Sequence, residues 1–283
     1  MTNDILKLNF SIIQIFYNGG KTMQGIIYYF SGTGNNYITA KKLSSMLPNT
    51  TFKEITHLLY DKVSIVHYDL IGFCVPSYYS HIPYIIQQCF QDITLTPSQT
   101  IFTIIGCGGN RGHATEDLRQ LINAAQGIVS YEYMLVYPGN YILSYDAPPK
   151  IYQKLVLAWS NHKIKKISND ILTKHPPITL PKGLFYNKND EPRLQKAIQN
   201  FGVQARTYTV SEVCKGCGIC QSVCPMHNVS LIDGKPTFGS TCQKCMACIQ
   251  WCPTHAIDWQ GVAQNRTHYH HPEVTCKELT KHP

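Results

Sequence analysis

Eight cysteines near the C-terminal end of this 283-residue chain have the spacing of metal-cluster ligands. They form two runs of the pattern C-x2-C-x2-C-x3-C-P, which begin 28 positions apart. Cysteine thiolates are soft ligands, and this spacing is typical of [4Fe-4S] clusters. The chemistry that these residues predict is one-electron transfer.

The repeat also predicts which cysteines share a cluster. A short loop offers three sulfurs to one cluster, and in two-cluster ferredoxins the last cysteine of each run ligates the other cluster. We therefore expect cluster one to be held by Cys214, Cys217, Cys220 and Cys252, and cluster two by Cys242, Cys245, Cys248 and Cys224. Two zinc sites are the alternative, although four-cysteine zinc sites do not require a repeated run with a trailing proline.

A second set of candidate residues follows an apolar run at 26–30. There, hydroxyls and backbone amides converge before a predicted helix, which is an arrangement that binds phosphate. The loop resembles the phosphate loop of flavodoxins, Ser/Thr-x-Thr-Gly-x-Thr, although asparagine replaces the last threonine. It lacks the Gly-Lys-Ser/Thr of a Walker loop and the third glycine of a dinucleotide fingerprint. The predicted phosphate-binding residues are Ser31, Gly32, Thr33, Gly34, Asn35 and Asn36.

Three further loops are expected to meet this one, at 76–79, 106–110 and 137–141. Each follows a predicted strand, and ligands of doubly wound sheets bind at the topological switch point beyond the strand ends. Small residues allow the backbone to approach a flavin ring, and aromatic residues can stack on it. The predicted ring contacts are Ser77, Tyr78, Tyr79, Gly108 and Gly109. The alternative is a scaffold with an empty flavin site that only docks partners.

The elements that must position these loops follow from hydrophobic periodicity. Apolar β-branched runs predict strands at 26–30, 70–75, 101–105 and 133–137. Helical spacing predicts helices at 37–47, after His113 and at about 150–172. This alternation indicates an α/β fold, which we expect to be a flavodoxin-like parallel sheet of order 2-1-3-4-5. A small α+β ferredoxin domain then follows.

Breakers and composition suggest how the chain is divided. We expect an N-terminal extension at 1–22, a flavodoxin-like domain at 23–173, a linker at 174–207 with a short helix near 191–201, a ferredoxin domain at 208–260 and a tail at 261–283. The segment before Met23 can be back-translated to a ribosome-binding site. We therefore hypothesise that translation starts at Met23 rather than Met1.

Composition restricts location and partners. The formal charge of +8 treats the cysteines as neutral, so cluster thiolates would offset it, and no basic stripe predicts nucleic-acid binding. Twelve cysteines without a secretory signal indicate a reducing cytoplasm. The apolar stretch at 5–17 is interrupted by polar residues and is too short to insert into a membrane. We expect redox proteins, or a small-molecule electron acceptor, as partners.

Taken together, the chain resembles the flavodoxin and ferredoxin fusions called EFR-family ferrodoxins. The resemblance rests on the loop at 29–35, the segment 76–83, both cysteine runs and the ending at 266–274. It implies an electron carrier that passes single electrons between two [4Fe-4S] clusters and FMN. One alternative is an FMN-dependent reductase of a small substrate, fed by the clusters, and another is a redox-sensing or docking module. No proton-shuttling pair or nucleophile is legible, so we name no catalytic residue.

Overall fold

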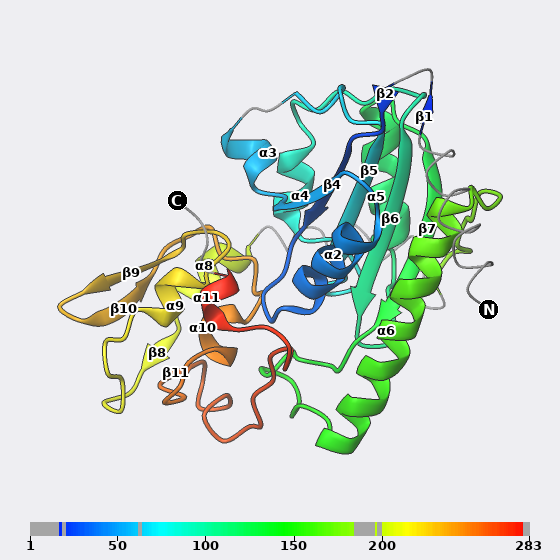
Figure 1. Ribbon diagram of the computed structural model, residues 1–283. Coiled ribbons are helices and arrows are strands. Elements are labelled where there is room, and N and C mark those ends of the chain that lie inside the picture. Colours follow the sequence, from blue (N-terminus) through cyan, green and yellow to red (C-terminus); the bar gives the residue numbers. More distant parts are fainter. Residues whose placement is uncertain (1–16, 19–20, 62–63, 184–195, 197–199, 280–283) are drawn as a thin grey trace.

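The computed structural model describes residues 17–18, 21–61, 64–183, 196 and 200–279. Most of the predicted extension and of the short helix near 191–201 lies outside these residues, and the hypothesis about Met23 stays untested. A two-stranded hairpin, β1 (Tyr17–Asn18) and β2 (Lys21–Thr22), precedes a five-stranded parallel sheet (Figure 1). The strands of that sheet are β3 (Gly25–Tyr29), β4 (Thr50–Glu54), β5 (Leu70–Pro76), β6 (Thr100–Cys107) and β7 (Val129–Val136).

The sheet has the order β4-β3-β5-β6-β7, which is 2-1-3-4-5 in chain order, so the predicted flavodoxin-like topology is confirmed. β4 was not among the predicted strands. Its sequence, TTFKE, alternates between exposed and partly buried positions because it pairs only with β3, at the edge of the sheet. A polar edge strand lacks the apolar run that reveals its buried neighbours.

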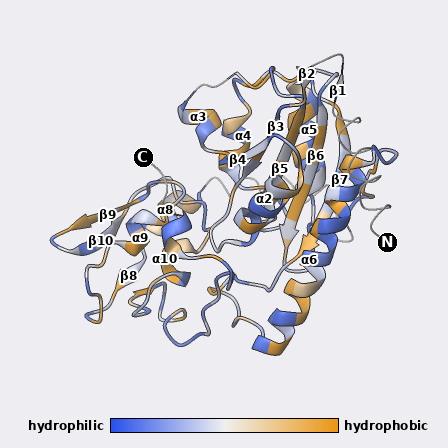
Figure 2. Cartoon of the chain, in the orientation of Figure 1, coloured by the Kyte–Doolittle hydropathy of each residue, from blue (hydrophilic) through white to orange (hydrophobic). Residues whose placement is uncertain are grey.

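Helices cover both faces of the sheet, and neighbouring residues of β3 alternate between them. Ile26 and Tyr28 pack with the helices α3 (His57–Tyr60), α4 (Tyr84–Cys89) and α5 (Ala114–Ala124). Ile27 and Tyr29 pack with α2 (Asn35–Met46) and α6 (Lys150–Leu172). Figure 2 shows hydrophobic residues gathered on the strands, while hydrophobic and hydrophilic residues alternate along α6. The helices predicted after His113 and at 150–172 are therefore present.

The C-terminal part consists of short elements around the two cysteine runs. Each run contains a single-turn helix, α9 (Ile219–Ser222) or α10 (Ala247–Gln250), and the two helices contact one another. Left-handed residues precede both helices, Gly218 with φ 76° and Met246 with φ 64°. The remaining elements are α8 (Phe201–Ala205), β8 (Thr209–Val210) paired with β11 (Ile257–Asp258), β9 (Val229–Ile232) paired with β10 (Lys235–Phe238), and α11 (Cys276–Leu279).

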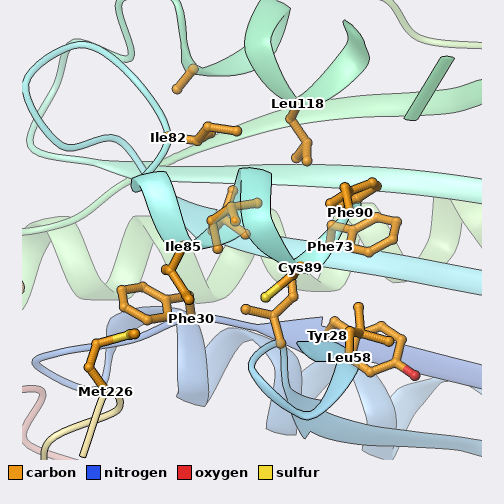
Figure 3. Close-up of a cluster of buried hydrophobic side chains, with 14 of the residues drawn as sticks. Tyr28, Phe30, Leu58, Phe73, Ile82, Ile85, Cys89, Phe90, Leu118 and Met226 are labelled. Atoms are coloured by element: carbon orange, nitrogen blue, oxygen red, sulfur yellow. The ribbon is translucent and has the colours of Figure 1, made fainter. Parts of the chain in front are cut away.

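The two parts share one hydrophobic core rather than meeting at a polar surface. Met226 directly follows the first cysteine run in sequence. It lies beside Phe30 and Ile85 of the sheet domain (Figure 3). In Figure 1 the cysteine-rich part, yellow to red, lies against the same end of the sheet as the start of α2. Within the described part of the chain, no helix combines the length and apolar character needed to cross a bilayer.

Candidate functional site: a cavity between the sheet and the cysteine-rich part

A cavity of about 340 Å³ lies beyond the C-terminal ends of β3, β5, β6 and β7. This volume is within the range of ligand pockets, and the position is the one where doubly wound sheets bind ligands. The predicted residues that line it are Ser31, Gly32, Thr33, Asn35, Asn36, Ser77, Tyr78, Tyr79 and Gly108. Gly34 and Gly109 do not line it. A Cβ on Gly34 would meet Val274 and His271 of the tail, whereas a Cβ on Gly109 would meet no heavy atom within 4 Å.

The phosphate-loop end of the cavity offers hydrogen-bond donors. The Oγ of Ser31 accepts a hydrogen bond from the Gly34 amide at 3.1 Å, and the Oγ1 of Thr33 accepts one from Asn140 Nδ2 at 2.5 Å. Both hydroxyls therefore keep their own hydrogen for a ligand. The first amides of α2 have no partner within the helix, and its dipole favours an anion there. These features fit a phosphate group.

Asn36, which replaces the last threonine of the flavodoxin pattern, stabilises the loop by a hydrogen bond to its backbone. Its Nδ2 donates to the Phe30 carbonyl oxygen at 3.0 Å, so one amide hydrogen is committed within the protein. Its Oδ1 is buried and finds no partner among the described residues. A Cβ on Gly106 would lie 2.3 Å from this oxygen, so the neighbouring strand end requires glycine.

Another part of the cavity wall is aromatic. Tyr79, Tyr141 and Tyr145 line it, the hydroxyls of Tyr79 and Tyr141 are hydrogen-bonded, and the rings of that pair lie 5.2 Å apart at 75°. Burial raises the pKa of both Tyr79 and Tyr141 above the ordinary value of tyrosine. Neutral aromatic walls of this kind suit a planar ring system such as isoalloxazine.

The third wall comes from the second cysteine run. Lys244, Cys245 and Met246 line the cavity, and a Cβ on Gly32 would lie only 2.2 Å from the carbonyl oxygen of Cys245. Backbone of the phosphate loop and backbone of the cysteine loop are therefore in direct contact. Sequence reasoning missed this wall because contact between distant loops leaves no periodic pattern. The sequence signal that could have indicated it is the glycine itself, since close backbone approach requires one.

Four hydrogen bonds join the cysteine-rich part and tail to the flavin-type loops. Trp251 Nε1 donates to Gly32 O at 3.0 Å, Gln250 Nε2 to Asn140 O at 2.7 Å, His271 N to Thr33 O at 2.8 Å, and Tyr269 Oη to Asn35 Oδ1 at 2.8 Å. Trp251, Gln250, His271 and Tyr269 are all buried. The loop that would bind phosphate is thus held by Trp251 of the second cysteine run and by Tyr269 and His271 of the tail.

The first predicted ligand set converges on a small hollow in the cysteine-rich part. Its lining includes all four predicted members, Cys214, Cys217, Cys220 and Cys252. Three of them come from the first run and one from the second. Cys217 is exposed, so this hollow lies close to the protein surface.

The second predicted set lies nearer the cavity. Burial raises the pKa of Cys245 and Cys248 well above the ordinary value of cysteine, and the nearby thiols of Cys242 and Cys224 raise it further. The buried hydroxyl of Tyr208 faces the thiol of Cys242, and burial, together with Cys242, Cys248 and Cys245, raises its pKa. A buried hydroxyl donor beside three thiols fits a sulfur-rich cluster, whose sulfurs accept hydrogen bonds.

The zinc alternative requires ligands grouped around one ion. Within the described ranges, no three His, Cys, Asp or Glu side chains are grouped so that they could hold a single metal ion.

Comparison with known proteins supports the iron-sulfur interpretation of the C-terminal part. Residues 213–257 match the family model of the 4Fe-4S dicluster domain. This match includes all eight cysteines of the two runs. No curated protein matches the chain.

The sheet domain is similar to several solved structures. A flavodoxin from Megasphaera elsdenii shares 16% identity over 39% of this chain and 85% of its own, with a TM-score of 0.33. A flavoprotein in complex with FMN from Lactobacillus acidophilus NCFM shares 13% over 40% and 93%, with a TM-score of 0.32. An azoreductase from Bacillus anthracis str. Sterne shares 10% over 52% and 100%, with a TM-score of 0.36. The fold assignment rests on strand order and parallel register rather than on these scores.

Proposed function

We propose that this chain passes single electrons between two [4Fe-4S] clusters and an FMN held in the cavity. The observation that carries the proposal is the position of Cys245, which belongs to the second predicted ligand set and also lines the cavity. A cluster on that set would lie directly behind the cavity wall. The match of 213–257 to a 4Fe-4S dicluster domain supports the clusters, and the donors and aromatic walls of the cavity support the flavin.

Residues in different parts of the cavity wall would have different roles. The hydroxyls of Ser31 and Thr33, with the first amides of α2, bind the phosphate. Tyr79 and Tyr141 border the ring system. When bound, FMN supplies chemistry that joins one-electron and two-electron transfer.

The two clusters would not be equivalent. Cluster two, on Cys242, Cys245, Cys248 and Cys224, is proximal to the cavity. Cluster one, on Cys214, Cys217, Cys220 and Cys252, is distal, and its exposed Cys217 makes it the site at which a redox partner exchanges electrons. Electrons would thus enter or leave at the surface and reach the cavity through cluster two.

A second candidate function is an FMN-dependent reductase of a small substrate. It is favoured by the open mouth of the cavity, where Tyr79 and Tyr145 are 38% and 48% exposed. A planar acceptor could reach the ring end from solvent. Steady turnover of a quinone, nitro compound or disulfide by the purified holoprotein would support this function over pure electron transfer.

The test is a cofactor assay on anaerobically purified protein. Iron and sulfide would be counted, flavin extracted and titrated back, and EPR spectra recorded after reduction with limiting dithionite while flavin absorbance is followed. Two clusters with one FMN that is reduced together with them would support the proposal. Two clusters without flavin, even after titration with excess FMN, would contradict it and favour the docking interpretation.

A further inference from the structure

Lys244 connects the second cysteine run to the cavity. It stands between Cys242 and Cys245, has a left-handed backbone with φ 50°, and donates its backbone N–H to Cys242 Sγ at 3.3 Å. The residue also lines the cavity, and it is only 6% exposed. One residue therefore faces the predicted cluster with its backbone and borders the cavity with its side chain.

Lys244 has no carboxylate partner among the described residues, and the thiol of Cys242, a predicted cluster ligand, is the group whose charge acts on it. Among the described residues, its Nζ makes no hydrogen bond or ion pair. The groups around Nζ are aromatic rings, with centroids at 4.8 Å for Phe201, 5.1 Å for Trp259 and 6.0 Å for Tyr79. Cation–π contacts hold an ammonium group in place but, unlike a carboxylate, do not neutralise its charge. The field of this cation therefore extends into the cavity.

No other charged side chain lines the cavity among the described residues. Of the described residues that line the cavity, Lys244 is the only one with a cationic side chain, and none is an aspartate or glutamate. Tyr79, Tyr141 and Tyr145 also line the cavity. A buried cation beside a cavity is stabilised by a ligand that carries negative charge.

We propose that Lys244 stabilises the negative charge that the flavin ring acquires on reduction, and so raises the reduction potential of the bound FMN. The inference rests on the proposed function. Uptake of two electrons and one proton from solvent adds one net negative charge to the ring system, and the protein tunes a flavin through charges placed near the ring. Lys244 would make a residue of the cysteine run part of the flavin site.

The test compares three variants of the FMN-loaded holoprotein by anaerobic redox titration with mediators. Lys244→Met removes the charge at similar length, Lys244→Arg keeps it, and Lys163→Met removes another ring-stacked lysine, 4.0 Å above the ring centroid of Trp159 on α6. Because the charge of Lys244 also acts on the ligand Cys242, the cluster potential should shift as well, and the flavin potential is the reading that tests the inference. We expect Lys244→Met to disfavour reduced flavin about tenfold, which is about 30 mV for a two-electron couple. The other two variants should remain within about threefold of wild type, or about 14 mV.

Flavin binding gives an independent reading of the same effect. By the thermodynamic cycle, Lys244→Met should weaken the binding of reduced FMN about tenfold more than that of oxidised FMN. If Lys244→Met does not fold, Lys244→Gln serves in its place. Unchanged flavin potential with bound FMN would overturn the inference and leave the proposed function intact. A shift of the cluster potential alone would overturn it too, because Lys244 would then act only on the cluster. A wild-type protein that binds no FMN would overturn both.

Discussion

The indole nitrogen of Trp251 donates a hydrogen bond to the carbonyl oxygen of Gly32 at 3.0 Å, across 219 positions of sequence. Trp251 immediately precedes the predicted ligand Cys252, and Gly32 lies in the predicted phosphate loop. The indole ring is 7% exposed and stacks on His270 with centroids 4.0 Å apart. This one bond therefore joins the iron-sulfur part of the chain to the loop that would hold the flavin phosphate.

Replacing Trp251 with phenylalanine should destabilise the protein. The change keeps an aromatic ring but leaves the buried Gly32 carbonyl without its donor, which typically costs about 1–3 kcal/mol. The matched control is Trp259→Phe, because Trp259 Nε1 donates to Thr207 Oγ1 at an exposed site where water can replace it. Denaturant unfolding of both variants measures the difference. Equal losses of unfolding free energy in the two variants would show that the Trp251 hydrogen bond contributes no more than the exposed one.

A methyl group on Gly32 should push the phosphate loop away from the second cysteine run. The new Cβ would lie 2.2 Å from the Cys245 carbonyl oxygen, so backbone must move, and overpacking of this kind costs about 1–3 kcal/mol. We expect Gly32→Ala to lower the melting temperature and the affinity for FMN together. Gly127→Ala is the control, since its Cβ would crowd Ile101, Leu95 and Ile122, which do not line the cavity, and it should lower the melting temperature without lowering the affinity for FMN. If both variants bind FMN like wild type, the contact does not shape the site.

Pairs of cysteine variants can test the predicted crossover. Cys217→Ser and Cys252→Ser should each remove about four iron atoms, and the double variant should lose no more than either single variant, because both residues are assigned to cluster one. Cys217→Ser with Cys224→Ser should lose both clusters. Iron and sulfide counts with EPR integration measure the losses. Cys276→Ser, outside both runs, should retain all iron, and loss of both clusters in the Cys217/Cys252 pair would refute the assignment.

Mild acid should loosen the tail that holds the phosphate loop. Burial lowers the pKa of His271 to about 4 from 6.5, so neutral His271 stabilises the fold above pH 6.5 and this contribution is lost as pH falls toward 4. Because the unfolded chain binds the proton more tightly, stability should fall by about 1–2 kcal/mol between about pH 7 and pH 5.5.

Unfolding by urea at the two pH values measures this loss, and His271→Asn is the comparison. Asparagine does not titrate, and its oxygen can replace His271 Nδ1 as acceptor of the Glu273 amide, which lies at 3.2 Å. The variant should therefore show a smaller decrease on acidification. The same decrease in both proteins would assign the pH dependence to other groups.

Sequence reasoning predicted the sheet order because buried parallel strands such as β5 and β6 are continuous apolar runs. It predicted most of the cavity because the loops that follow such strands must meet at one edge. β4 was missed because an edge strand is half exposed and carries polar residues.

The contacts between the two parts could not be predicted in this way. Lys244 stands as an ordinary spacer between two ligand cysteines, and nothing in its local sequence indicates that three aromatic rings will surround its ammonium group. Tyr269 and His271 belong to the predicted tail at 261–283, and no pattern there indicated that they would be 1% exposed and bind the phosphate loop. Such contacts depend on how two separately patterned segments dock, which periodicity does not encode.

The backbone contact between Gly32 and Cys245 has a kinetic consequence for the proposed conduit. Two separate carriers must find each other by diffusion, and their exchange rate depends on concentration and on salt. Here the cluster loop forms part of the cavity wall, so the encounter is built into the chain and its effective concentration is set by the fold. The exchange should then be first order and insensitive to dilution, and recognition of a partner is left to the surface around Cys217.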